Sequence, residues 1–164
     1  MSETVDIFKI LAELKIPYEK QEHKAIFSEE DSKDVVITLE GMDVKNLFVK
    51  DKNKNYGLVS MNLHKRADLK KIAEQFGFGR LSFCNPDELL LYLNITPGSV
   101  TPLCIMFDTE KKVKVLFDQN FEGKKVIIHP LRNTASVSIS FEDLKRFTEH
   151  FGHKWQLCDV YKDE

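Results

Sequence analysis

The sequence is poor in cysteine, and its few cysteines do not have the spacing of a structural or metal-binding set. Cys84, Cys104 and Cys158 are odd in number and far apart, and no Cys-x-x-Cys pair occurs. We therefore expect neither a disulfide framework nor a zinc site built on cysteine pairs. This use of cysteine fits the reducing environment of the cytoplasm, which we take as the expected location.

Long apolar runs and a strong charge of one sign are also lacking. The first residues show no apolar segment of the kind found in signal peptides. The sequence also contains no run of 18 apolar residues, the length that could cross a bilayer. We expect no contact with a membrane. The net charge of −2 provides no general attraction to polyanions, so a polyanionic partner would have to meet a local basic patch.

The common sequence motifs of catalysis are missing as well. No G-x-S-x-G, Walker loop, G-x-G-x-x-G or H-E-x-x-H pattern occurs. His150 and His153 resemble part of a metal site, but no third ligand is near them, so we expect no metal and no cofactor. Cys84 and Cys104 have no partner base in the sequence and are better explained as small buried residues. A hydrolase made from this chain would lack a conventional nucleophile.

The composition is that of an ordinary globular protein. The 164 residues include 42% hydrophobic and 30% charged residues, and twelve phenylalanines supply a substantial core. A chain of this length predicts one domain, which we place at residues 1–164.

Hydrophobic periodicity and turn residues predict a mixed α/β or α+β fold with helices packed on the sheet. Helices are expected at residues 7–14, in a short stretch capped by Ser28, at 69–76 and 86–93, and after Ser140. Two hairpins are expected, one pairing residues 45–49 with 56–60 and the other pairing 103–107 with 113–117. Further strands are expected at 125–128, 135–139 and 155–160, and the apolar stretch 35–39 ends at Gly41.

The segment from Pro97 to Pro102 stands out as a candidate binding loop between a helix and a core strand. Its two prolines lack amide donors, and Gly98 tolerates a positive φ or the close approach of a ligand. Ser99, Val100 and Thr101 keep their amides, and three free amides could hold an oxyanion, a carboxylate or a phosphate. The alternative is an ordinary connection, because glycine and proline are common in loops.

Two further residues could carry chemistry. Lys45 begins an apolar strand, where its charge could hold a phosphate or carboxylate; the alternative is a solvated lysine. His129 precedes Pro130, which favours an extended backbone that could face a ligand; the alternative is a packed or surface histidine. Asn133 and Thr134 follow, either as ligand contacts or as turn residues. The stretch 45–80 is basic, either as a solvated face or as a modest phosphate-binding track.

These features together resemble the prolyl-tRNA editing domain family, the YbaK/ProX type of aminoacyl-tRNA deacylase. The ProX branch, which removes alanine from mischarged proline tRNA, is the nearest match. The matching stretches follow one another through nearly the whole chain and are residues 45–51, 66–70, 79–83, 96–102, 129–134 and 143–159. The combination of Lys45, the Gly98-x-x-x-Pro102 loop and the His129-Pro130 turn is specific, although each piece alone is not.

The resemblance implies a mixed, partly curled sheet surrounded by helices, and the hydrolysis of an aminoacyl ester. It implies that Lys45 holds the phosphate of the terminal nucleotide, that the Gly98 loop fixes the carbonyl and the water, and that His129 contacts the aminoacyl group through its main chain. The other substrate-binding residues it implies are Asn46, Ser99, Val100, Thr101, Pro102, Asn133, Ile26 and Phe27. The ribose hydroxyl of the substrate would orient the water, since the sequence offers no evident general base.

The partners implied are the acceptor end of the proline tRNA and, transiently, prolyl-tRNA synthetase, with the protein a monomer or weak homodimer. Lys24 stands where the family often has proline, and Ile127 and Ile128 where small or polar residues are usual. Both departures concern the choice of side chain removed. The alternatives are a YbaK-type deacylase of cysteinyl-tRNA, a non-catalytic aminoacyl- or tRNA-binding module, and a regulator that binds free amino acids.

Overall fold

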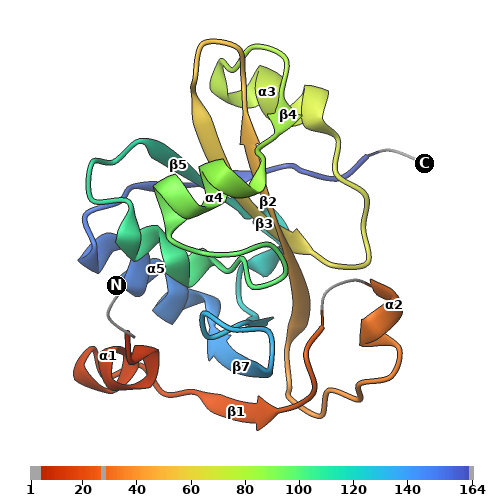
Figure 1. Cartoon of the computed structure of the whole chain (residues 1–164), viewed down its shortest axis with the longest axis vertical. Coiled ribbons are helices and arrows are strands. Elements are labelled where there is room, and N and C mark those ends of the chain that lie inside the picture. The colour runs from red at the N-terminus through yellow and green to blue at the C-terminus, as the bar shows by residue number, and fades with distance from the viewer. Residues whose placement is uncertain (1–4, 27–28, 163–164) are drawn as a thin grey trace.

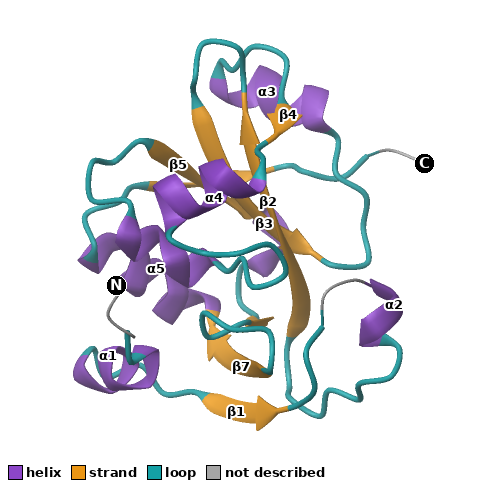
Figure 2. Ribbon diagram, in the orientation of Figure 1, coloured by secondary structure: helices purple, strands orange, loops and turns teal. Residues whose placement is uncertain are grey.

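The computed structural model describes residues 5–26 and 29–162 and contains a mixed β-sheet with helices on both faces (Figures 1 and 2). The helices are α1 (Ile7–Glu13), α2 (Glu29–Ser32), α3 (Leu69–Phe76), α4 (Pro86–Leu93) and α5 (Phe141–His150), with two 3₁₀ helices, η1 (Pro102–Phe107) and η2 (Gln119–Phe121). The strands are β1 (Glu19–Glu22), β2 (Met42–Lys50), β3 (Tyr56–Asn62), β4 (Ser82–Phe83), β5 (Val113–Asp118), β6 (Lys125–Ile128), β7 (Ala135–Ser140) and β8 (Trp155–Cys158). None of the described helices is long and apolar enough to span a bilayer.

The sheet has the strand order β1-β7-β6-β2-β3-β5-β8, and β4 pairs with β2 outside this order. The pairs β2/β3, β2/β4, β6/β7 and β1/β7 are antiparallel, whereas β2/β6, β3/β5 and β5/β8 are parallel. The fold is therefore of the mixed α/β type that the sequence predicts.

Strand β2 is paired along one whole edge but only at the two ends of the other edge. On the second edge it pairs with β6 at Met42 and Asp43 and with β4 at Val49 and Lys50. Within the described part of the chain, no strand pairs with this edge at residues 44–48. We call this interruption the β2 gap.

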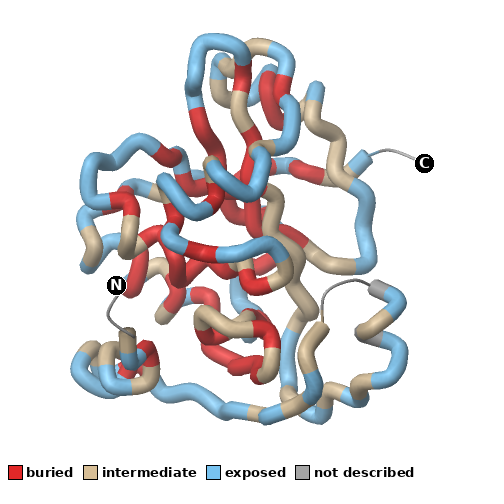
Figure 3. Tube along the Cα trace, viewed as in Figure 1, coloured by how far each residue is buried: buried red, intermediate tan, exposed pale blue. Residues whose placement is uncertain are grey.

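Two hydrophobic cores cover the two faces of the sheet, and Figure 3 shows buried segments running through the middle of the molecule. The larger core takes its buried helical residues from α1, α4, η1, η2 and α5, and Phe117, Phe121 and Phe141 pack there as edge-to-face rings. The smaller core lies under α3, which contributes Ile72 and Ala73. Each buried phenylalanine contributes about 1.5–3 kcal/mol of hydrophobic stabilisation.

Most predicted elements are confirmed. Helix α4 is an example, because its sequence contains clear signals for the start of a helix. The Asn85 side chain accepts a hydrogen bond from the Glu88 amide at 2.8 Å, and the Glu88 side chain accepts one from the Asn85 amide at 3.0 Å. Pro86 occupies the first turn, where its missing amide costs nothing. The predicted hairpin of β2 and β3 is confirmed.

The predicted strand at 103–107 is wrong, and so is the hairpin built on it. This stretch is the 3₁₀ helix η1, which begins with Pro102 after the N-cap Thr101. A short apolar run does not distinguish a buried strand from a buried helix. Strand β5 instead pairs in parallel with β3.

The apolar stretch 35–39 is irregular, and Val36 is 77% exposed. The Gln21 side chain of β1 holds the stretch by donating to the Val36 carbonyl and accepting from the Thr38 amide. The capping role expected for Ser28 falls outside the described residues, although α2 follows at the expected place.

Candidate functional site

The β2 gap presents main-chain groups of Asn46 that no strand uses. The Asp43 carbonyl accepts from the Leu63 amide on the β3 side, whereas the Phe48 carbonyl accepts from the Cys84 amide on the β4 side. Because the direction of the peptide groups alternates along a strand, Asn46 directs its N–H and C=O to the same edge as Phe48. That edge is the gap, so a ligand could bind there as an added strand partner does.

The loop between α4 and η1 is fastened to β2 beside this gap. The Asn46 Nδ2 donates to the Val100 carbonyl at 3.1 Å, and the Ser60 hydroxyl donates to the Asn46 Oδ1 at 2.6 Å. The two bonds fix the orientation of the Asn46 amide, because each of its ends has a partner of the right kind. Gly98 has a φ of +89°, as its sequence context predicts. In Figure 1 this loop passes in front of the sheet beside β2.

The expectation of three free amides in this loop is wrong for Ser99, whose amide donates to the Thr96 carbonyl at 3.2 Å. Thr101 is fully buried and caps η1, with its hydroxyl accepting from the Leu103 amide. Pro102 is also buried. Within the described residues, the amides of Val100 and Thr101 have no hydrogen-bond partner. The loop therefore leaves two donors unused, and of these only the amide of the half-buried Val100 belongs to a residue that solvent or a ligand can reach.

The parallel pairing of β2 with β6 ends shortly before Lys45 on one strand and His129 on the other. Asp43 lies opposite Ile127 in the last pair, and Lys45 and His129 each follow that pair by two residues, where the β2 gap opens. Lys45 and Asn46 point to opposite faces, because side chains alternate along a strand. The candidate residues therefore lie on both faces of β2 around the gap.

His129 is held as a neutral imidazole with one bare nitrogen. Its Nδ1 lies 3.1 Å from the Ala135 carbonyl oxygen, which accepts only, so Nδ1 carries the proton. Burial lowers the pKa of His129, the Ala135 carbonyl raises it, and the nearby His23 lowers it. The unprotonated Nε2 can then accept a hydrogen bond from water, a hydroxyl or an ammonium group.

His23 is a neighbour of His129 that the sequence analysis did not identify as a site residue. The two ring centroids are 6.4 Å apart. His23 donates through Nδ1 to the Lys24 carbonyl at 2.7 Å, and its Nε2 accepts from the Ser136 hydroxyl at 2.9 Å. The pairing of β1 with β7 creates this contact, and nothing in the local sequence around His23 or Ser136 indicates it.

The segment before α2 is clamped onto the turn that follows His129. The Asn133 side chain donates to the Ile26 carbonyl at 3.2 Å, and the Ile26 amide donates to the Asn133 carbonyl at 3.2 Å. Arg132 makes a two-pronged ion pair with Glu22 at 2.8 Å, which lowers the pKa of that carboxyl to about 2. Phe27, also predicted to bind substrate, lies outside the described residues.

The cysteines are poor nucleophiles in this environment. Burial raises the pKa of Cys84 and of Cys104 to about 12, so both are thiols at neutral pH. Across residues 5–26 and 29–162, no cluster of three His, Cys, Asp or Glu side chains could hold a metal ion.

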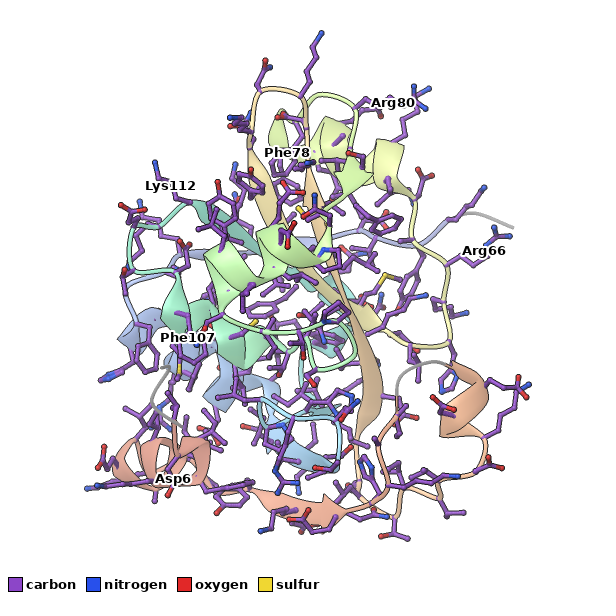
Figure 4. All side chains as sticks on the ribbon, viewed as in Figure 1. Asp6, Arg66, Phe78, Arg80, Phe107 and Lys112 are labelled. Carbon is purple, nitrogen blue, oxygen red and sulfur yellow. The ribbon has the colours of Figure 1, made fainter. Side chains whose placement is uncertain are left out.

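The basic stretch 45–80 is not one continuous patch. Lys50 is paired with both carboxylate oxygens of Glu88 at 2.8 Å. Arg66 and Arg80 are exposed, and Figure 4 shows them on separate parts of the same side of the molecule. Any phosphate contact from this stretch therefore comes from individual side chains.

Comparisons with known proteins agree on one family. The model of the aminoacyl-tRNA editing domain matches residues 23–147. The chain is 34% identical over 152 residues to the prolyl-tRNA editing protein ProX of Acetoanaerobium sticklandii, covering 92% of this chain and 93% of that protein. It is 36% identical over 149 residues to the prolyl-tRNA synthetase associated domain-containing protein 1 of Bos taurus, covering 87% and 86%. The crystal structure of hypothetical protein APE2540 has the same fold, with a TM-score of 0.75 at 17% identity and coverage of 95% and 99%.

Proposed function

We propose that the substrate of this protein is a mischarged proline tRNA, from which it removes alanine. The proposal rests on the family: the chain belongs to the aminoacyl-tRNA editing domain family and is an aminoacyl-tRNA deacylase. The printed name of the ProX relative supports the choice of tRNA, and the resemblance of the Gly98 loop and His129 turn to the ProX branch supports alanine. We also propose that residues 1–164 act as one editing domain. The fastening of the Gly98 loop to Asn46 beside the β2 gap is the observation that carries this proposal.

The reaction is an attack of water on an activated ester. Such an ester needs no strong protein nucleophile, which agrees with the protonated state of Cys84 and Cys104. What the protein must supply is positioning and stabilisation of the oxyanion. We assign the second role to the unused amide of the half-buried Val100, and one such donor is worth about 10²–10³ in rate.

Lys45 and His129 are assigned to the nucleotide and aminoacyl ends of the substrate. The Lys45 ammonium holds the phosphate of the terminal nucleotide as a point charge. The main chain of His129 contacts the aminoacyl group, and its bare Nε2 accepts a hydrogen bond from the ribose hydroxyl. That hydroxyl orients the attacking water, and Asn46, Asn133 and Ile26 fix the walls around it.

Selection against proline is steric in this scheme. A site closed by Ile26 and the Gly98 loop admits a methyl group and excludes the larger proline ring. A missing methylene is worth only about 1–3 kcal/mol, so glycyl and seryl esters should also be cleaved. The choice between alanine on the proline tRNA and alanine on its own tRNA must come from the acceptor stem or from a partner. We propose prolyl-tRNA synthetase as that partner, bound transiently, and the name of the Bos taurus relative supports this.

The test is single-turnover deacylation of alanyl, cysteinyl and prolyl esters on the proline tRNA, with and without prolyl-tRNA synthetase. We expect the alanyl ester to be cleaved fastest and the prolyl ester to be spared. Equal or faster cleavage of the prolyl ester would rule out the editing role. A preference for the cysteinyl ester would move this chain to the YbaK type of specificity.

A further inference from the structure

A second concave surface lies away from the β2 gap, where three neighbouring parallel strands begin. Tyr56 lies opposite Val113, and Val115 lies opposite Trp155, so β3, β5 and β8 start side by side. A groove of about 840 Å³ runs across these strand starts and is closed on one side by Phe78 after α3. Phe78, which follows α3, and Lys112, which precedes β5, both line the groove and are labelled in Figure 4.

The groove is basic although the chain as a whole is not. Four lysines line it, namely Lys111, Lys112, Lys114 and Lys154. Among the described residues that line it, none is Asp or Glu. None of the four lysines makes an ion pair within the described part of the chain, whereas Lys50 and Lys145 elsewhere are paired with Glu. Their charge is thus available to an anion.

Aromatic and buried polar groups line the same groove. Lys114 lies over the Phe78 ring at 5.2 Å from its centroid, and the half-buried Trp155, whose ring packs on Phe117 and Phe141, also lines the groove. His153 also lines the groove and is 95% buried, yet its Nε2 has no hydrogen bond. Asp108 lies 3.3 Å from that nitrogen but spends its two oxygens on the amides of Lys112 and Val113. Cations beside aromatic faces are the usual surface for nucleotides, whose phosphates and bases they bind.

We infer that this groove binds the sugar–phosphate backbone of RNA, as a second contact for the tRNA body outside the candidate active site. The inference rests on the proposed function for the identity of the RNA. Tyr56, at the groove, and Ser60, opposite Asn46, are four residues apart on β3, which is about 13 Å. One RNA arm can therefore touch both places. Lysines on the rim would follow a backbone without reading sequence, and so would add affinity but not specificity.

The experiment uses Trp155, the only tryptophan of the chain, as a reporter in the groove. Uncharged proline tRNA is titrated against the protein at several salt concentrations, following Trp155 emission and the binding constant, with ADP as a parallel probe. The Lys112→Ala/Lys154→Ala variant removes two groove charges. The Lys9→Ala/Lys124→Ala variant is the matched control, because both of its lysines are exposed and lie outside the groove.

We expect the groove variant to bind the tRNA more weakly and to reduce the slope of log K against log salt by about 2, whereas the control keeps the wild-type slope. Equal slopes for the two variants, or saturation of the Trp155 signal by ADP but not by tRNA, would overturn the inference. This titration measures binding only, and hydrolysis is measured in the deacylation test described above. A reduced salt slope in the groove variant, together with no deacylation by the wild-type protein, would support the groove and reject the proposed function. An unchanged salt slope together with deacylation of the alanyl ester would reject the groove and support the proposed function.

Discussion

At the scale of single residues, Lys45 is the side chain on which the proposed chemistry depends most directly. It is half-buried and lies on β2 two residues after the last residue that pairs with β6. Its long stem and single charge suit it to hold a phosphate in one place.

We predict that Lys45→Ala lowers kcat/KM for deacylation by about 10²-fold while the protein stays folded. Losing the phosphate contact shifts the ester relative to the Gly98 loop, and a misplacement of about 1 Å has an effect of this size. Single-turnover rates measure the change, and circular dichroism checks the fold. Lys52→Ala is the control, because Lys52 is an exposed lysine in the β2–β3 turn. A folded Lys45→Ala protein with a rate close to that of Lys52→Ala would make Lys45 an ordinary surface lysine.

Some residues of the candidate site are readable from the sequence and others are not. Gly98 between two prolines predicts a loop with a positive φ, and Gly98 has a positive φ in the structure. The use of the Ser99 amide in a turn to Thr96 depends on how that loop closes, which the sequence does not specify. The contact between His23 and His129 requires β1 to pair with β7, a long-range event that leaves no local sign.

At the scale of elements, the Gly98 loop depends on a hydrogen-bond relay from β3 through β2. Ser60 on β3 fixes the Asn46 amide, and Asn46 on β2 holds the Val100 carbonyl. Ser60 is 1% exposed, so it acts on the loop only through Asn46.

We predict that Ser60→Ala loosens the loop at a modest cost in stability, about 1 kcal/mol for one lost hydrogen bond. Without the hydroxyl the Asn46 amide is free to rotate and to release the Val100 carbonyl. Hydrogen exchange should show faster exchange at the Ser99 amide, which bonds to the Thr96 carbonyl in the closed loop, and deacylation should slow several-fold. Ser82→Ala on β4 is the comparison, because Ser82 is exposed. Unchanged exchange in the loop of the folded Ser60→Ala protein would show that Asn46 holds its orientation unaided.

Elements with local signals were predicted well, and those set by distant packing were not. The capping box at Asn85 and the apolar stripe of α3 can be recognised from the local sequence alone. The apolar run of η1 carries no period that separates a strand from a helix, and only Pro102 and the Thr101 cap explain its form afterwards. The parallel pairing of β2 with β6, which ends at the β2 gap, joins segments about eighty residues apart and could not be predicted from either.

At the scale of the whole molecule, the half-buried His129 and the buried His153 make stability depend on pH. Burial lowers the pKa of His129 and of His153 below the ordinary value of 6.5. Below pH 6.5 the unfolded chain therefore binds more protons at these positions than the folded chain does, so stability is full above this pH and is lost as pH falls through the folded pKa values.

We predict that the free energy of unfolding, measured with urea, declines from pH 7 to pH 5. His153→Gln should flatten this decline, whereas His150→Gln, at an exposed position, should leave it unchanged. A separate decline should follow below pH 4, where Glu22 and Asp51, each with a pKa of about 2, lose their partners Arg132 and Asn55. The same slope between pH 7 and 5 in wild type and His153→Gln would show that His153 titrates normally.

The β2 gap links the packing of the molecule to its chemistry. Val44 and Phe48, on either side of Asn46, turn their side chains into the larger core. Their packing decides where the Asn46 peptide lies, although neither side chain faces the gap. A related protein could carry many surface substitutions and keep the Asn46 peptide in place. A substitution of one of these two core residues would move it. Selection for a well-packed interior and selection for accurate translation would then act on the same few positions, and neither trait could drift without the other.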